Sequence, residues 1–214
     1  MSATPFANIG MEIQPAQVAM FTSLARLLKE RHGSRIHLYV RGRVEEDAYR
    51  KNNSDGLWDT VTNDNVHIPA LQKEGLEERE VIAQARRMEG LIGEPINRLA
   101  LANRQMGHAF AVGAWRHPVA PFMTRASNIQ LLHALTESMA FWEREIREKG
   151  LNLVMDGSKF MAATAHSMGV PYRRLSLARF ETYCYWAVNQ NFDHPGLKET
   201  YDALEDWPEA EIGE

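Results

Sequence analysis

The segment Asp156-Gly157-Ser158-Lys159 places an acid, a flexible glycine, a hydroxyl and a cation next to one another. It lies between a predicted strand, 151–155, and a predicted helix, 160–168, where a serine hydroxyl can cap the helix. The free N–H groups at the start of a helix favour anions. The segment therefore predicts either a turn that holds a phosphate or a sugar hydroxyl, or a helix start that is simply well capped.

The run Trp115-Arg116-His117-Pro118 is the second candidate for chemistry, because it lies in a stretch rich in glycine and proline, 107–121. Such loops hold polar groups on an irregular backbone and carry function more often than helix faces do. Arg116 and His117 are therefore candidate site residues; the alternative is that they cap neighbouring helices. The eight histidines are poorly spaced for a metal site, so no metal is expected.

Several motifs with known chemistry are missing. The segment 10–15 lacks the spaced glycines that let a backbone approach a dinucleotide pyrophosphate, and the chain has no Walker A sequence. Asp156–Lys159 is not a Gly-x-Ser-x-Gly turn, and no Ser/His/Asp order is evident. A nicotinamide cofactor and phosphoryl transfer from a nucleoside triphosphate are therefore not expected, and no cofactor is predicted.

Composition narrows the class of protein. The chain has 214 residues, 44% of them hydrophobic and 24% charged, which is enough for one globular domain with a sizeable core. The net charge of −4 argues against a nucleic-acid partner, because binding to phosphates needs a basic surface. Arginines do cluster at 41–43 and 173–179, which suits an anionic small molecule.

Cys184 is the single cysteine, so no internal disulfide and no oxidising compartment are implied. Its aromatic neighbours, Tyr183, Tyr185 and Trp186, predict a buried and inert thiol. We find no signal-peptide pattern and no apolar run long enough to span a bilayer, so a cytoplasmic location is expected.

The first third of the chain predicts a strand–helix–strand unit. An apolar run, 6–9, ends at Gly10, and a helix follows from Pro15 to His32, with apolar residues at helical spacing and Gly33 as its stop. Arg35–Val40 is rich in β-branched and aromatic residues and predicts a strand. Such units impose parallel strands. The next stretch, 42–76, predicts a loop with short irregular pieces.

The rest of the chain predicts three helices, then a second strand–helix–strand unit. The helices are 77–92, 96–106 and 129–149, and the unit comprises strand 151–155, helix 160–168 and strand 172–177. We therefore predict an α/β fold: a doubly wound, mainly parallel open sheet with an inserted helical section at about 71–121. The single domain is expected to span 1–204, with an acidic tail at 205–214.

In such sheets, ligands bind beyond the carboxyl ends of the strands. This rule selects the loops 10–14, 40–43, 156–159 and 176–179. From these loops and the central one, we expect a crevice lined by Glu12, Gln14, Arg41, Arg104, Arg116, His117, Asp156, Ser158, Lys159 and Arg179.

Three stretches are similar to a known family: 6–17 with 36–40, 98–107 with 115–118, and 153–157 with 162–172. The chain resembles the N-terminal, acceptor-side Rossmann-like domain of bacterial capsular or surface-polysaccharide biosynthesis glycosyltransferases of the GT-B architecture. The likeness implies a cytoplasmic glycosyltransferase-like transferase domain that binds an acceptor glycan or a lipid-linked sugar. It implies no metal, with His117 or Asp156 as base and with Arg41, Lys159 or Arg179 giving cationic help.

The architecture also implies a second, donor-binding domain, for which this chain has no room. By resemblance, the chain is then the acceptor-side half of an enzyme that needs a donor-binding domain or a partner chain, a shortened form of a longer protein, or a stand-alone relative. The alternative is a non-enzymatic scaffold, in which helices 77–92 and 129–149 form a partner surface or a homo-oligomer. A sugar-nucleotide isomerase relative is a third reading. A crevice with convergent polar groups favours an enzyme, whereas one filled by Leu, Met or Trp favours a scaffold.

Overall fold

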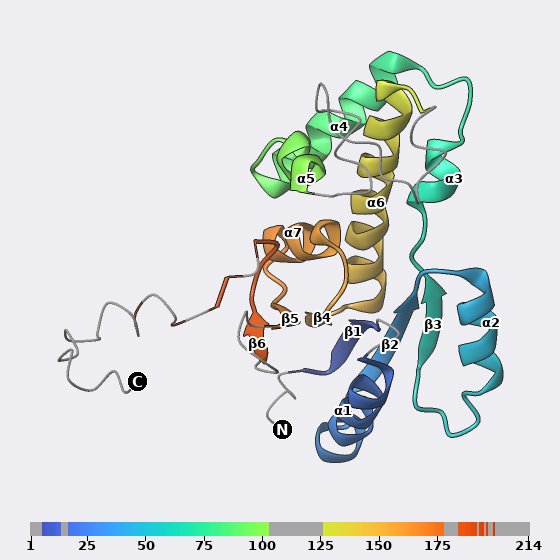
Figure 1. The fold of residues 1–214 in the computed structure, drawn as a ribbon, viewed down its shortest axis with the longest axis vertical. Helices are drawn as coiled ribbons and strands as arrows, with labels where there is room; N and C mark the ends of the chain where they lie inside the picture. Colours follow the sequence, from blue (N-terminus) through green and yellow to red (C-terminus); the bar gives the residue numbers. More distant parts are fainter. Residues whose placement is uncertain are drawn as a thin grey trace, which may run out of the picture.

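The computed structural model describes residues 6–13, 17–102, 126–177 and 184–191, together with 193, 194, 196 and 199. Within these residues the chain forms one six-stranded sheet with the order β3-β2-β1-β4-β5-β6 (Figure 1). The pairings from β3 to β5 are all parallel, and β6 joins β5 in the antiparallel sense. The predicted α/β fold with a mainly parallel open sheet is confirmed.

The first strand–helix–strand unit is present as predicted. It comprises β1 (Asn8–Glu12), α1 (Val18–His32) and β2 (Arg35–Val40). α1 ends at Gly33, whose left-handed backbone, φ 64°, suits a residue without a Cβ. β1 continues past Gly10 to Glu12, two residues further than the apolar run indicates, and this places the acid at the carboxyl end of the strand.

The predicted loop at 42–76 is wrong. The structure has α2 (Arg43–Lys51), β3 (Thr60–Asn63) and α3 (His67–Leu71) there. β3 pairs in parallel with β2, in the register Tyr39↔Thr62. Its pattern is weak because the strand is short and polar, with one buried residue, Val61. No side chain of α2 is buried, so that helix lacks an apolar stripe.

Three helices occupy the stretch between α3 and β4: α4 (Glu78–Ile92), α5 (Ile96–Ala102) and α6 (Asn128–Lys149). α6 begins with a capping box, in which the Ser127 and Gln130 side chains each accept the other's backbone N–H. Hydrogen bonds join α4 to α6 at Gln84–Glu137 and Arg87–Glu143. The predicted helices at these positions are confirmed over the described residues; 103–106 lie outside them.

The second strand–helix–strand unit is also present, as β4 (Leu153–Met155), α7 (Lys159–Ser167) and β5 (Tyr172–Leu177). β6 (Cys184–Ala187) follows at the edge of the sheet. The expected burial of Cys184 is wrong: the thiol is exposed, because an edge strand leaves side chains at its margin uncovered.

Helices cover both faces of the sheet (Figure 1). On one face, alternate strand residues such as Ile9, Met11 and Leu38 pack with α1 and, through Tyr49, with α2. On the other face, Tyr39 and Val154 belong to the core formed with α6 and α7, and α3 and α4 pack against α6 further from the sheet. The strands β1, β2 and β4 therefore bury both of their sides, as expected for parallel sheets.

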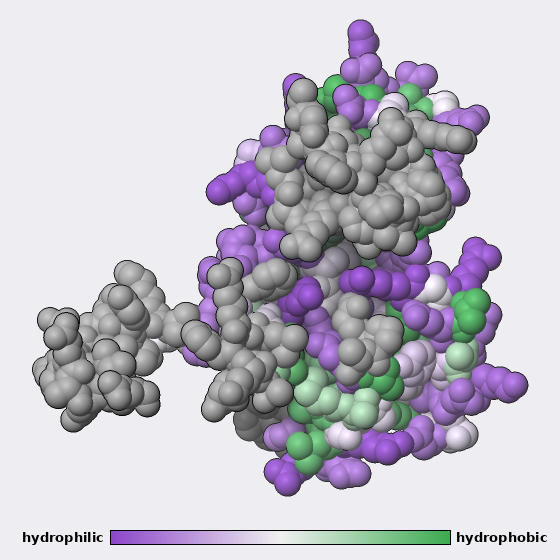
Figure 2. Space-filling view, in the orientation of Figure 1, coloured by the Kyte–Doolittle hydropathy of each residue, from purple (hydrophilic) through white to green (hydrophobic). Residues whose placement is uncertain are grey.

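The exposed surface is mostly hydrophilic on the face shown in Figure 2, with hydrophobic side chains in small patches over its lower part. The large exposed apolar side chains of α1 and α2 are Met20, Leu27 and Val44. No helix among the described residues has the length and apolar character needed to cross a membrane.

Candidate functional site

Charged side chains gather at the carboxyl ends of β1, β2, β3 and β4 and at the same level of β5. Side chains two residues apart in an extended chain point to the same face of a sheet. Each of these residues lies two positions after one that faces α6 and α7, such as Tyr39 or Val154, so all of them share that face. Taken in the order of the strands from β3 to β5, this strand-end row consists of Asp64, Arg41, Glu12, Asp156 and Arg174.

Glu12 and Arg41 form the tightest pair of the row. The Glu12 side chain is 1% exposed, and its Oε1 accepts a hydrogen bond from Arg41 Nε at 2.6 Å, with the terminal nitrogen of the guanidinium at 2.5 Å. Burial lowers the pKa of Arg41, but the charge of Glu12 and this hydrogen bond outweigh it, and the pKa rises above its ordinary value. The guanidinium is thus held in place and charged, with half of its side chain exposed.

Asp64 follows β3 and extends the row beyond Arg41. Its backbone N–H donates to Val40 O at 2.9 Å, and no described group hydrogen-bonds its buried Oδ1. Burial, followed by the charge of Glu12 and a hydrogen bond with it, raises the pKa of Asp64 to about 9. Asp64 is therefore a neutral acid at neutral pH. The sequence analysis did not select Asp64, because it did not predict β3.

Asp156 is the most constrained residue of the row. It adopts a left-handed backbone, φ 57°, the only such non-glycine residue in the described part of the chain. Its Oδ1 accepts the Gly157 N–H at 3.1 Å and lies 3.5 Å from Arg174 Nε, whereas its buried Oδ2 has no hydrogen-bond partner among the described residues. Burial, opposed by Arg174 and assisted by the charge of Glu12, raises the pKa of Asp156 to about 6.

Gly157 brings the turn after β4 against the row. Its φ is 90°, and a Cβ there would lie 2.9 Å from Glu12 Oε2 and would collide with the Met161 sulfur. Arg174 donates a hydrogen bond to Gly157 O at 2.9 Å and so ties the turn to β5. A larger residue would push the turn away from Glu12.

Two further polar side chains border this turn. The Tyr172 hydroxyl is buried, no described group hydrogen-bonds it, and burial raises its pKa above the ordinary value. Lys159 is the first residue of α7, and its pKa is lowered by burial and then by the charge of Arg174. Ser158 caps α7, with its Oγ accepting the Met161 N–H at 3.2 Å.

The structure thus brings together three of the site residues proposed from the sequence: Glu12, Arg41 and Asp156. Ser158 and Lys159 lie beside them at the start of α7. The remaining candidates lie outside the described residues; they are Gln14, Arg104, Arg116, His117 and Arg179. Asp64 and Arg174 are site residues that the sequence analysis did not select, although Arg174 belongs to the arginine cluster noted there.

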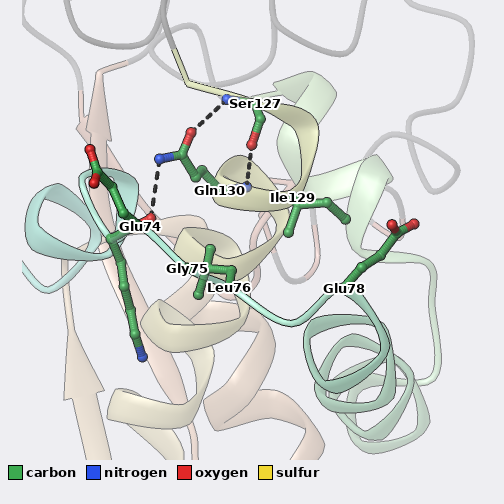
Figure 3. A pocket seen from close by; sticks show the side chains of 8 residues that line it. Glu74, Gly75, Leu76, Glu78, Ser127, Ile129 and Gln130 are labelled. Carbon is green, nitrogen blue, oxygen red and sulfur yellow. Dashed lines mark hydrogen bonds between the residues drawn. The ribbon is translucent and has the colours of Figure 1, made fainter.

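A separate cavity of about 360 Å³ lies at the start of α6, at the opposite end of that helix from the sheet (Figures 1 and 3). Figure 3 shows Ser127 and Gln130 hydrogen-bonded to each other at its wall, which leaves the helix start already capped. None of the predicted site residues lines this cavity. In the part of the chain that the structure describes, no cluster of His, Cys, Asp or Glu is arranged to hold a metal ion.

Comparison of the chain with protein-family models, with curated proteins and with solved structures finds no match. The chemistry of the strand-end row is therefore the basis on which a function can be proposed.

Proposed function

We propose that this protein is the acceptor-binding half of a glycosyltransferase-like enzyme in capsule or surface-polysaccharide biosynthesis. The strand-end row binds the acceptor sugar, and Asp156 is the general base that takes the proton of its reacting hydroxyl. The observation that carries the proposal is the buried Asp156 carboxyl group, whose Oδ2 has no hydrogen-bond partner among the described residues. Buried polar atoms are ordinarily paired, so this oxygen at a strand end can accept a hydrogen bond from a ligand hydroxyl.

The proton affinity of Asp156 suits this role. With a pKa of about 6, the side chain is ionised at neutral pH and still basic enough to accept a proton. The strained backbone at Asp156 agrees with a functional position, because such strain persists at sites where geometry matters. Arg174 stabilises the carboxylate and holds the turn that carries it.

In the proposed reaction, the acceptor hydroxyl oxygen attacks the anomeric carbon of a nucleotide sugar. Asp156 Oδ2 takes the hydroxyl proton, a new glycosidic C–O bond forms, and the bond from the anomeric carbon to the nucleotide phosphate breaks with its electron pair. The donor is held by a further domain or a partner chain, as the family resemblance implies. His117 stays an alternative base.

The row also favours this function over a scaffold. Convergent charged groups at a strand end are typical of a binding site. The apolar stripes of α4 and α6, which a partner surface was expected to use, pack inside the chain; α4 buries Val81, Ala85 and Met88. In this proposal α4 and α5 belong to a helical insertion in a Rossmann-like domain, and the protein acts in the cytoplasm.

The test combines binding and turnover. Saturation-transfer NMR of the purified chain with a panel of sugars and lipid-linked sugar analogues is expected to detect acceptors, and Asp156→Asn is expected to weaken their binding several-fold. Asp47→Asn, a change at an exposed acid of α2, is the control. With nucleotide sugars added, nucleotide release by the chain alone is expected to be negligible. Absence of any acceptor binding refutes the proposal, and robust turnover refutes the half-enzyme part of it.

A further inference from the structure

The charges of the strand-end row follow a definite order across the sheet. From β3 to β5 the groups are an acid, a base, two acids and a base: Asp64, Arg41, Glu12, Asp156 and Arg174. Glu12, Asp156 and Arg174 occupy neighbouring positions, since the paired residues Met11, Met155 and Arg173 immediately precede Glu12, Asp156 and Arg174. A ligand that covers the row therefore meets charges of both signs at close quarters.

Both arginines of the row are already paired with carboxylates. Arg41 binds Glu12, and Arg174 lies 3.5 Å from Asp156. An anionic ligand that approaches either arginine also meets the adjacent carboxylate, and a cationic ligand that approaches a carboxylate also meets the arginine. The paired charges therefore disfavour a net charge of either sign on the ligand.

Unlike the two arginines, three polar atoms near the row have no hydrogen-bond partner among the described residues. Asp64 Oδ1, Asp156 Oδ2 and the Tyr172 hydroxyl are buried, and no described group hydrogen-bonds them. Asp64 and Asp156 directly follow β3 and β4, and Tyr172 is the first residue of β5, so the three residues lie on both sides of Glu12 in the strand order. Sugar hydroxyls can serve all three, because a hydroxyl both donates and accepts hydrogen bonds.

We propose that the strand-end row recognises an uncharged sugar through its hydroxyl groups, and that Asp64 is a further ligand-binding residue that acts as a neutral acid. The inference rests on the proposed function and specifies its substrate class. Asp64 fits the role because the burial and the neighbouring Glu12 that raise its pKa to about 9 keep its proton in place at neutral pH. The proton lies in the hydrogen bond with Glu12, so the buried Oδ1 remains as an acceptor for a sugar hydroxyl.

The start of α7 is the feature that would favour an anionic ligand instead. There Lys159 lies beside Arg174, and helix starts attract phosphate. The Ser158 hydroxyl already accepts the Met161 N–H at this helix start. Because this helix start is already capped, we expect the paired charges of the strand-end row to determine which ligand binds. A phosphorylated sugar is the comparison ligand that tests this expectation most directly.

The first experiment measures ligand charge preference on the wild-type chain by saturation-transfer NMR. The probes are the methyl glycosides of glucose, galactose and mannose, compared with glucuronate, glucosamine and glucose 1-phosphate. At least one neutral sugar is expected to bind roughly tenfold more tightly than every charged probe. Equal or tighter binding of a charged probe that Asp156→Asn weakens would overturn the inference and leave the proposed function standing. No binding of any probe would refute both.

The second experiment tests whether Asp64 binds the sugar as a neutral carboxyl group or as a charged carboxylate. Asp64→Asn keeps a neutral group that donates and accepts, so binding of the neutral sugar is expected to stay within about twofold of wild type. Asp64→Ala removes both, with an expected loss of roughly tenfold. Asp47→Ala is the control, and near-UV circular dichroism checks each fold. An equal loss in the Asn and Ala variants would show that Asp64 acts as an anion, and the inference would be wrong. If Asp64→Ala does not fold, the first experiment and Asp64→Asn still decide.

Discussion

Two groups of buried polar side chains on the same sheet face are built in opposite ways. Below the strand ends, Tyr39, Thr62, Glu145 and Lys149 form a closed network between β2, β3 and the end of α6. Lys149 Nζ reaches Glu145 at 2.5 Å, Thr62 Oγ1 at 3.0 Å and the Tyr39 hydroxyl at 3.3 Å, and that hydroxyl donates to Glu145 at 3.0 Å. Every charge in this network has a partner from the chain itself.

The strand-end row leaves atoms without partners. Asp64 Oδ1 and Asp156 Oδ2 are buried and have no described hydrogen-bond partner. The backbone of the strand-end row also departs from regular structure, because Asp156 and Gly157 are consecutive left-handed residues. The residues of the closed network, in contrast, belong to strands and a helix. The difference indicates that the network stabilises the fold and that the row keeps capacity for a ligand.

The largest effect is expected in the closed network. Glu145→Ala removes the partner of a largely buried Lys149 and of the Tyr39 hydroxyl, and is expected to lower the free energy of unfolding by about 3 kcal/mol. Urea denaturation measures it. Glu148→Ala, an exposed acid on the same helix, is the control, with an expected change below about 0.5 kcal/mol. Equal effects of the two changes would contradict a stabilising role for the network.

In the strand-end row, removing a charge is expected to raise the free energy of unfolding at neutral pH. The pKa of Asp156 is raised from 3.8 to about 6, so protonated Asp156 stabilises the fold at low pH, and this contribution is lost as the pH rises through about 6. Asn stays neutral and tolerates a left-handed backbone. Asp156→Asn is therefore expected to be more stable than wild type at pH 7, by up to about 3 kcal/mol, and close to wild type at pH 4. Urea denaturation at pH 7 and at pH 4 checks this. A variant that is less stable than wild type at pH 7 would mean that Asp156 stabilises the fold, as the closed network does.

His37 gives a smaller test beside the network, where its Nδ1 lies 3.0 Å from Thr60 Oγ1. Burial, followed by the charge of Lys149, lowers the pKa of His37 from 6.5 to about 4. The neutral ring stabilises the fold above pH 6.5, and this contribution is lost as the pH falls through 4. Relative to wild type, His37→Gln is expected to gain about 2 kcal/mol between pH 7 and pH 4, after allowance for nearby water. Urea denaturation showing no such gain would mean that the ring is charged or solvated.

The smallest effect lies far from both groups, at the capping box of α6. Ser127→Ala removes the acceptor of the Gln130 N–H and is expected to lower the free energy of unfolding by about 1 kcal/mol. Thermal unfolding measures it, and Ser127→Asp, which keeps an acceptor, is the control. Sugar binding is expected to be unchanged; a change there would mean that the helical layer and the row are coupled.

Prediction from sequence succeeded where a strand lay between helices with clear apolar stripes. Asp156 was found because β4 is a buried apolar run and the strand-end rule then selects the next residue. Arg41 was found in the same way, after the buried run of β2. The parallel sheet itself followed from the two strand–helix–strand units.

Prediction failed where burial is set by neighbours from distant parts of the chain. β3 has the sequence Thr-Val-Thr-Asn, and its half-buried threonines are hydrogen-bonded to His37 and Lys149 from other elements. Asp64 was missed with it, since a short polar segment carries no periodic signal of a strand. Cys184 was misjudged because its aromatic neighbours suggested a core, whereas β6 is an edge strand.

The central place of β1 in the strand order has a consequence for how the protein is made. One side of β1 pairs with β2, which follows it closely in the chain, but its other side waits for β4; the Asn8 N–H bonds an Asn152 side chain 144 residues away. Because domains fold as the chain emerges, one edge of β1 stays open until the last third of the chain is synthesised. An open strand edge is a template for aggregation. Chaperone protection during this interval, and early termination products that aggregate, are therefore expected properties of the nascent chain.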